Sequence, residues 1–292
     1  MMLVPEYSGF YINLDRSTQR RATVESQLAA LGLTRSYSRF TAVDGTKLSY
    51  PTSAISSGEL GCFVSHARLL RACADLGKHV HVLEDDVLLS AELAPALHEL
   101  IARRAFDQID LIFTDVFVPI DCDRIAEYEQ LMQAVTQFDE GARRETVSSL
   151  RLIDLRGRLW AATSSYVVAD RSVDRVAGLL ENELKIGPRG PVDLVLRQLV
   201  SSGALTAACV MPFLTSVDLA GDFESTTRQG ASAQVRSRVA SNIVRQMFFV
   251  RPDWGTISKI VQQQFPPTPK PLRQEIINRM LDFRVFGDFQ RF

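Results

Sequence analysis

The chain contains 292 residues, of which 46% are hydrophobic, and its 33 Lys and Arg nearly balance 34 Asp and Glu. This length and composition allow one large folded domain, or one domain with a smaller module. The near-zero net charge gives no indication of a nucleic-acid partner. Four cysteines without C-x-x-C spacing or the density of a disulfide scaffold predict reduced thiols in a cytosolic protein.

The N-terminal residues lack a basic region followed by an apolar segment, and no stretch approaches about 18 continuous apolar residues. We therefore expect neither a signal peptide nor a membrane span. Self-similar repeats are absent, which argues against a solenoid.

The chain begins with the pattern of a strand, a helix and a second strand. The apolar run Gly9–Leu14 predicts a strand, and Ser17–Leu31 has apolar residues at helical spacing on one face. Tyr37–Val43 predicts a second strand, which ends at the turn dipeptide Asp44-Gly45. An α/β fold is therefore expected.

Ser56 and Glu59 have the S-x-x-E spacing of a capping box, so a helix should begin near residue 57. Apolar residues then recur three and four positions apart as far as Leu70. Gly77 suits the left-handed position that ends many helices, which predicts a helix end there.

Three adjacent carboxylates, Glu84, Asp85 and Asp86, follow the predicted strand His79–Leu83. The carboxyl edge of an open α/β sheet is where ligands bind, and carboxylates crowded there repel one another unless a cation neutralises them. Oxygen-only ligands favour Mg²⁺ or Mn²⁺. The alternative from these residues alone is an exposed acidic turn.

The later part of the chain continues the alternation. It predicts helices at Ala91–Arg104, Arg124–Phe138 and Leu194–Ser202, a helix capped by Asp170, and strands at Asp110–Val116, Leu159–Ala169 and Ala204–Met211. Asp115 stands near the end of its strand. Asp193 stands at a helix start, where an Asp is ordinarily a cap.

The run GELGCFVSH followed by VLEDDV resembles glycosyltransferase family 25, the bacterial lipooligosaccharide galactosyltransferase family, which also has collagen-modifying animal relatives. Family members carry an E-D-D variant of the D-x-D metal motif. INLDRSTQR, FTAVDG, the P-V-D at 191–193 and the segment 221–227 are similar to further parts of the family pattern, and the resemblance spans roughly residues 8–230.

The resemblance implies a GT-A-type nucleotide-binding fold with a mainly parallel sheet flanked by helices. It also implies an inverting, metal-dependent transfer of a hexose, with galactose expected, from a UDP-sugar to a hydroxyl of a glycan or lipid-linked saccharide such as the lipooligosaccharide core. The donor-binding residues that the resemblance implies are Asn13, Arg16, Asp44, Glu84 and Asp85. Asp86 and Glu84 are the expected ligands of Mn²⁺ or Mg²⁺.

The candidates for the catalytic base, which would accept the proton of the acceptor hydroxyl, are Asp193 first, then Asp115 and Asp222. Arg16 suits diphosphate because its fork donates paired hydrogen bonds. Without the resemblance, Arg16 would be a solvated charge at a helix start.

The chain after about residue 232 is basic and rich in aromatic residues. We therefore expect a catalytic domain at 1–232 and a helical extension at 233–292. Residues 236–292 could contact an anionic membrane face, or equally pack on the catalytic domain. The expected location is cytoplasmic, with a peripheral position on the inner membrane face as a variant.

Two other classes of function remain open. One is another metal- and nucleotide-dependent enzyme, a nucleotidyltransferase or phosphohydrolase, which would use the same carboxylates to attack phosphorus. The other is a non-catalytic carbohydrate-binding relative. The pattern leaves the oligomeric state open.

Overall fold

The structure is a computed structural model that describes residues 7–48, 55–119, 125–140, 150–219 and 232–265. A seven-stranded sheet has the order β2-β1-β3-β7-β5-β8-β6. Its strands are β1 (Tyr7–Asn13), β2 (Tyr37–Thr41), β3 (His79–Glu84), β5 (Leu111–Phe113), β6 (Arg151–Asp154), β7 (Ser165–Val168) and β8 (Ala207–Met211). All of these except β6 and β7 run in the same direction. This confirms the predicted α/β class of GT-A type, with a mostly parallel sheet.

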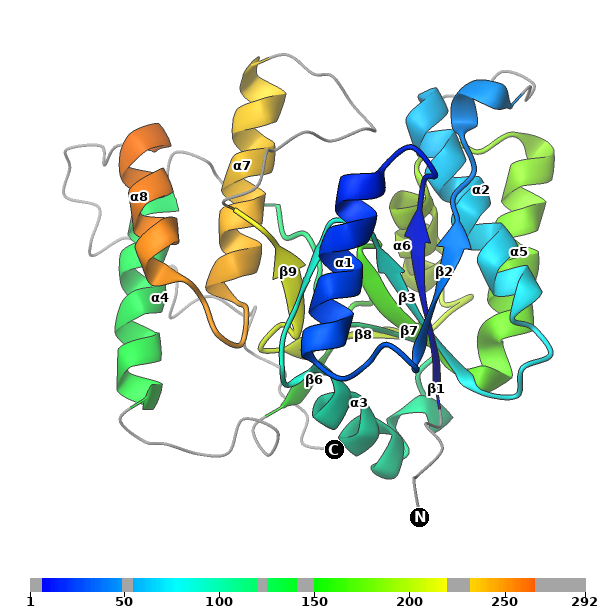
Figure 1. Cartoon of the computed structure of the whole chain (residues 1–292), viewed down its shortest axis with the longest axis horizontal. Helices are drawn as coiled ribbons and strands as arrows, with labels where there is room; N and C mark the ends of the chain where they lie inside the picture. Colours follow the sequence, from blue (N-terminus) through cyan, green and yellow to red (C-terminus); the bar gives the residue numbers. More distant parts are fainter. Residues whose placement is uncertain (1–6, 49–54, 120–124, 141–149, 220–231, 266–292) are drawn as a thin grey trace.

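Helices cover both faces of the sheet (Figure 1). On one face lie α1 (Thr18–Ala30) and α3 (Leu93–Ala102), whose apolar residues join the cluster that contains Val24, Leu28 and Leu97. On the other face lie α2 (Ser57–Ala72), α5 (Val173–Ile186) and α6 (Val192–Ser201), and Phe63 and Val176 belong to their cluster. The β-branched and aromatic side chains of the strands fill both clusters because successive side chains of a strand face opposite ways.

Helix α2 begins where the capping box predicts. The Ser56 hydroxyl accepts from the Glu59 N–H, and the Glu59 carboxylate accepts in return from the Ser56 N–H. Its predicted end at Gly77 is wrong, because the helix ends at Ala72. Residues 73–76 continue as turns, with the Leu76 N–H donating to the Cys73 carbonyl, and Gly77 takes its positive φ of 60° within the connection to β3.

The segment predicted as one strand, Leu159–Ala169, is extended as a strand only at Ser165–Val168. Ala162 has a φ of 75°, which ends the extended conformation before β7. Asp170 does not cap the following helix as predicted. It begins a 3-10 turn over Asp170–Ser172, and Ser172 is the residue that precedes α5. Strand β6 and the pair β4 (Val87–Leu89) and β9 (Thr215–Val217) were not predicted.

Helices α7 (Ser232–Met247) and α8 (Trp254–Gln264) pack with α4 (Ile125–Glu140) beside strand β9 (Figure 1). Together they bury a third apolar cluster, which includes Ile243 of α7 and Ile257 of α8. The described part of the C-terminal extension therefore packs against the rest of the chain. The boundary between 1–232 and 233–292 stays a prediction, and no helix in the described ranges is long and apolar enough to cross a membrane.

Candidate active site

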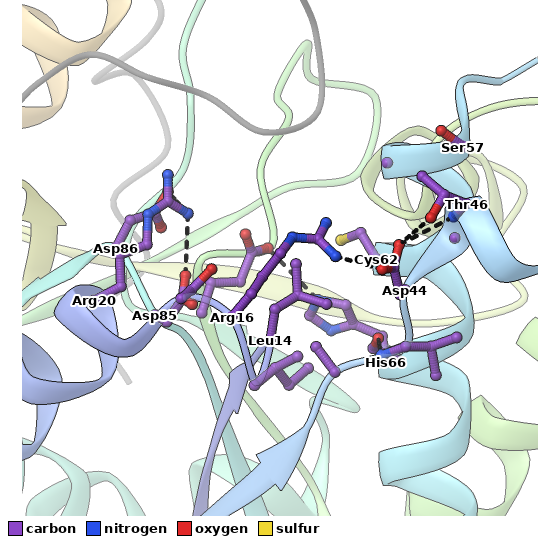
Figure 2. A pocket seen from close by; sticks show the side chains of 18 residues that line it. Leu14, Arg16, Arg20, Asp44, Thr46, Ser57, Cys62, His66, Asp85 and Asp86 are labelled. Carbon is purple, nitrogen blue, oxygen red and sulfur yellow. Dashed lines mark hydrogen bonds and ion pairs between the residues drawn. The ribbon is translucent and has the colours of Figure 1, made fainter.

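A cleft of about 180 Å³ opens at the carboxyl edge of β1, β2 and β3 (Figure 2). The edge is formed by the loops that leave these parallel strands, together with the first three turns of α2. The arginine, histidine and carboxylate side chains that line the cleft are Arg16, Arg20, Asp44, His66, Glu84, Asp85 and Asp86. The cleft thus brings together residues that the sequence places in four separate segments, as ligand sites of open α/β sheets do.

The three adjacent carboxylates take different environments. Glu84, the last residue of β3, accepts a hydrogen bond from the Thr163 hydroxyl at 2.9 Å and lies 3.5 Å from Nε2 of His66. Asp85 accepts from the Asn13 amide at 2.7 Å and from Arg20 at 3.2 Å. Asp86 is about half exposed, 48%, and its carboxylate lies 3.9 Å from the Arg20 guanidinium. Asp86 is therefore the carboxylate most open to an incoming ion.

Asn13 is buried, and its side chain forms hydrogen bonds to three segments beside the cleft. Its amide donates to Asp85 and to the Ser17 carbonyl, and its amide oxygen accepts from Arg39 at 3.0 Å. Through these three contacts Asn13 orients Asp85, which lines the cleft. Its role as a direct donor-binding residue stays a prediction.

Arg16 and Asp44 form an ion pair at the opposite side of the cleft (Figure 2). Asp44 also accepts from the Thr46 N–H at 3.1 Å and from the Thr46 hydroxyl at 2.7 Å. This turn lies directly against α2, because a Cβ at Gly45 would stand 1.7 Å from the Ser57 carbonyl oxygen. Only glycine allows this close approach, which fixes the Asp44 carboxylate at the rim.

The electrostatics of the cleft differ from one carboxylate to the next. Desolvation, and then the Glu84 charge, raise the pKa of Asp86 to about 6. Desolvation also raises the pKa of Asp85, and it opposes the ionisation of Glu84. The nearby His66 imidazole, together with the hydrogen bond from Thr163, outweighs that effect, so the pKa of Glu84 lies below its usual value. The ionised form of Glu84 is thus favoured. Asp86 holds its proton more readily, and a bound cation would stabilise its ionised form.

Asp193, the first candidate for a catalytic base, lies in the first turn of α6. Its Oδ2 accepts from the Ala162 N–H at 3.0 Å, and Ala162 is adjacent to Thr163, which binds Glu84. The side chain is partly exposed. Asp193 is thus connected to the carboxylate site through two neighbouring residues of one loop.

Asp115, the second candidate, lies at the end of β5 and is buried, with 1% of its surface exposed. Its carboxylate binds Arg245 of α7 and accepts from the hydroxyls of Ser164 and Thr215. A carboxylate buried against Arg245 is not open to an acceptor hydroxyl in the cleft, so this arrangement favours Asp193. Asp222, the third candidate, lies outside the described residues.

The sequence analysis missed Arg20, Thr163 and Arg245 as residues of this region. Arg20 lies in the first turn of α1, four residues after Arg16, so its place in the INLDRSTQR run could have indicated it. Thr163 and Arg245 reach the acids from positions 79 and 130 residues away from Glu84 and Asp115, and no local pattern marks them.

Comparison with known proteins gives two findings. Residues 7–193 match the family described as glycosyltransferase family 25 (LPS biosynthesis protein). A "Glycosyltransferase 25 family member" of Drosophila pseudoobscura pseudoobscura is 32% identical over 124 residues, which cover 36% of this chain and 20% of the relative. The match thus spans about a fifth of that relative's length, and the matched family region contains all the described cleft residues.

Proposed function

Since the chain belongs to glycosyltransferase family 25, we propose that it is an inverting, metal-dependent hexosyltransferase. Its donor is a UDP-sugar, with UDP-galactose as the first candidate, and its acceptor is a hydroxyl of a glycan such as the lipooligosaccharide core. The observation that carries the proposal is the cleft itself, where carboxylates and arginines converge at the carboxyl edge of the sheet.

The chemistry of the donor set fits a hard divalent ion. Glu84 and Asp86 both line the cleft with carboxylate oxygens, and desolvation together with the Glu84 charge raises the pKa of Asp86, which a bound cation would reverse. We assign Asp86 and Glu84 as the residues that hold Mn²⁺ or Mg²⁺. The ion would neutralise charge on the departing diphosphate.

The chain's own residues then divide the remaining tasks. Arg16 lies at the rim beside Asp44, where its guanidinium suits a diphosphate oxygen pair. Asn13 orients Asp85, which in turn holds Arg20 in the cleft. Asp193 is the base that removes the proton of the acceptor hydroxyl during in-line attack, which gives inversion at the anomeric carbon.

The described part of the extension, residues 233–265, packs against the rest of the chain, and this packing explains its apolar residues without a membrane. Apolar residues of α7 such as Ile243 and Val244 are buried in the cluster with α4 and α8, and Arg245 is buried against Asp115. Residues 266–292 lie outside the described residues. A peripheral contact with a membrane stays a proposal, which a liposome flotation assay of the full chain tests.

The experiment for the donor site is calorimetric titration with UDP-galactose, UDP-glucose and UDP-N-acetyl sugars, each with and without Mn²⁺. We expect selective binding that requires Mn²⁺ and is lost in Asp86→Ala. Asp107→Ala is the matched control, because Asp107 is a half-exposed carboxylate in the turn before β5. If no UDP-sugar binds, the non-catalytic reading replaces the proposal. If inorganic phosphate or pyrophosphate is released from a nucleotide, the chain attacks phosphorus instead.

A further inference from the structure

Three donor side chains meet at the inner wall of the cleft. Cys62 and His66 are one turn apart on α2, and Glu84 ends the neighbouring strand β3. The Cys62 sulfur, a His66 ring nitrogen and a Glu84 carboxylate oxygen all lie within 4.8 Å of one another. Cys62 and His66 both line the cleft, so the cluster is open to what enters it (Figure 2).

His66 supplies an independent observation that points to a ligand. Its side chain is completely buried, and its Nδ1 shares a hydrogen bond of 2.8 Å with the Tyr166 hydroxyl. Its Nε2 has no hydrogen-bond partner among the residues that the structure describes, although it points toward Glu84 at 3.5 Å. Buried ring nitrogens are normally satisfied, so an unpaired Nε2 beside two other donor atoms needs an explanation.

We propose that Cys62 Sγ, His66 Nε2 and the Glu84 carboxylate together bind one borderline divalent ion of the Zn²⁺ type. Sulfur, imidazole nitrogen and one carboxylate oxygen are the ligand set that such an ion prefers, with a fourth position left toward the cleft. The ion would displace the Cys62 thiol proton to solvent. This site goes beyond the proposed hexosyl transfer and does not depend on it.

The geometry fits this kind of ion. Bonds of about 2.0–2.2 Å at tetrahedral angles separate nitrogen and oxygen ligands by roughly 3.3–3.5 Å, and Nε2 and the Glu84 oxygen are 3.5 Å apart. The Cys62 sulfur lies within 4.8 Å of both atoms, so it would have to move closer to form a bond of about 2.3 Å to the ion. Tyr166 holds the other ring nitrogen, as outer partners of metal-bound histidines generally do, and ring stacking at 5.7 Å fixes the imidazole plane.

The proposed site differs from the oxygen site for Mn²⁺ in one ligand that matters for the test. Asp86 belongs to the oxygen site and is absent from the cluster of sulfur and nitrogen donors. Glu84 belongs to both. A borderline ion at the cluster therefore competes with Mn²⁺ for Glu84, and we expect Zn²⁺ to weaken Mn²⁺ binding.

The test is titration of the reduced full chain with Co²⁺ alone, followed by absorption spectroscopy. We expect a thiolate-to-cobalt charge-transfer band together with the intense visible bands of tetrahedral Co²⁺, and their loss on addition of Zn²⁺. Cys62→Ala and His66→Gln should abolish the charge-transfer band, and Tyr166→Phe should weaken Co²⁺ binding by about 10–100-fold. Cys73→Ala, which removes a buried thiol elsewhere on α2's C-terminal turn, is the matched control and should keep the band.

The outcomes separate this site from the donor site. Retention of the band in Asp86→Asn supports an ion held by Cys62, His66 and Glu84, whatever the result with UDP-sugars. A wild-type chain without a charge-transfer band overturns the proposal, as does a band that survives in Cys62→Ala or disappears in Cys73→Ala. Circular dichroism of each variant, with Cys62→Ser as a second, size-conserving substitution, distinguishes loss of the ligand from loss of the fold.

Discussion

Arg245 of α7 donates hydrogen bonds from Nε and Nη2 to a single carboxylate oxygen of Asp115, with the Nε–Oδ2 distance at 2.9 Å. Both side chains are buried, at 5% and 1% exposure. Arg245 also donates to the Ser164 hydroxyl, in the loop that precedes β7. Helix α7 is thereby joined to the central sheet by a polar contact as well as by its apolar face.

Replacing Arg245 by Met should lower the free energy of unfolding by about 3–5 kcal/mol, because it leaves the buried Asp115 carboxylate without its counterion. Denaturant unfolding of the full chain measures this. The matched control is Arg251→Met, which breaks an ion pair with Glu92 whose arginine is 70% exposed. That change should cost less than about 1 kcal/mol. Equal losses in the two variants would contradict the importance given to the buried pair.

Replacing Asp193 by Asn should lower kcat by about 10²–10⁴-fold, the usual contribution of a general base. The affinity for the UDP-sugar should stay unchanged, since the prediction places Asp193 on the acceptor side. Steady-state transfer assays with calorimetry of donor binding check both parts. Asp174→Asn, at an exposed carboxylate of α5, serves as the control. Near-normal transfer by Asp193→Asn would remove Asp193 from the mechanism.

The stability of metal-free protein should depend on pH in opposite ways at two aspartates. The pKa of Asp86 is raised to about 6, so its ionisation disfavours the folded state and removes stability as pH rises from about 4 to 6. Asp86→Asn should therefore gain stability relative to the wild type across that window. Mn²⁺ should reverse the difference by stabilising the ionised wild type.

The pKa of Asp110 is shifted in the opposite direction to that of Asp86. Hydrogen bonds from Ser172 and Thr206 outweigh desolvation and lower the pKa of Asp110 to about 2. Its contribution is present above about pH 4 and is lost as pH falls toward 2. Asp110→Asn should be less stable than the wild type at pH 7, with a deficit that shrinks in acid. Thermal unfolding of both variants between pH 7 and pH 3 decides the issue, and parallel curves would contradict both pKa shifts.

Gly45→Ala should destabilise the protein by about 1–3 kcal/mol or more, because the new methyl group would collide with backbone atoms of α2. The Asp44 turn would move away from the helix, so donor binding should weaken as well. Gly178→Ala, in the middle of α5, is the control, since the nearest atom to its new Cβ is an Arg71 nitrogen at 3.6 Å. That substitution should stabilise the helix by about 0.5–1 kcal/mol. Thermal unfolding and calorimetry of both variants measure the contrast.

Local patterns in the sequence predicted the features that interactions between neighbouring residues determine. The capping box placed the start of α2, and strand periodicity placed Glu84, Asp85 and Asp86 at the edge of the sheet. The order of the strands brings Asn13 next to Asp85, although the two residues are 72 positions apart in the sequence. No local pattern encodes that contact.

The same limit explains the misjudged elements. The end of α2 depends on turn hydrogen bonds among residues 73–76, which compete with helix continuation by small free-energy differences. The left-handed backbone of Ala162 shortened the predicted strand, and nothing in an Ala residue announces such a conformation. The different environments of the three acids arise from His66, Arg20 and Thr163, which only the folded chain brings together.

Each arginine at the mouth of the cleft already has an internal anion: Arg16 has Asp44, and Arg20 has Asp85. A diphosphate that entered alone would have to displace these carboxylates and leave them without counterions. If a divalent cation enters with it, the carboxylates can turn to the metal while the guanidinium groups turn to the phosphates. Binding of the donor would then exchange the partners of both kinds of group: the metal would take the carboxylates, and the diphosphate would take the guanidinium groups that the carboxylates release. Simple anions such as inorganic phosphate, which bring no cation, would compete poorly for the site.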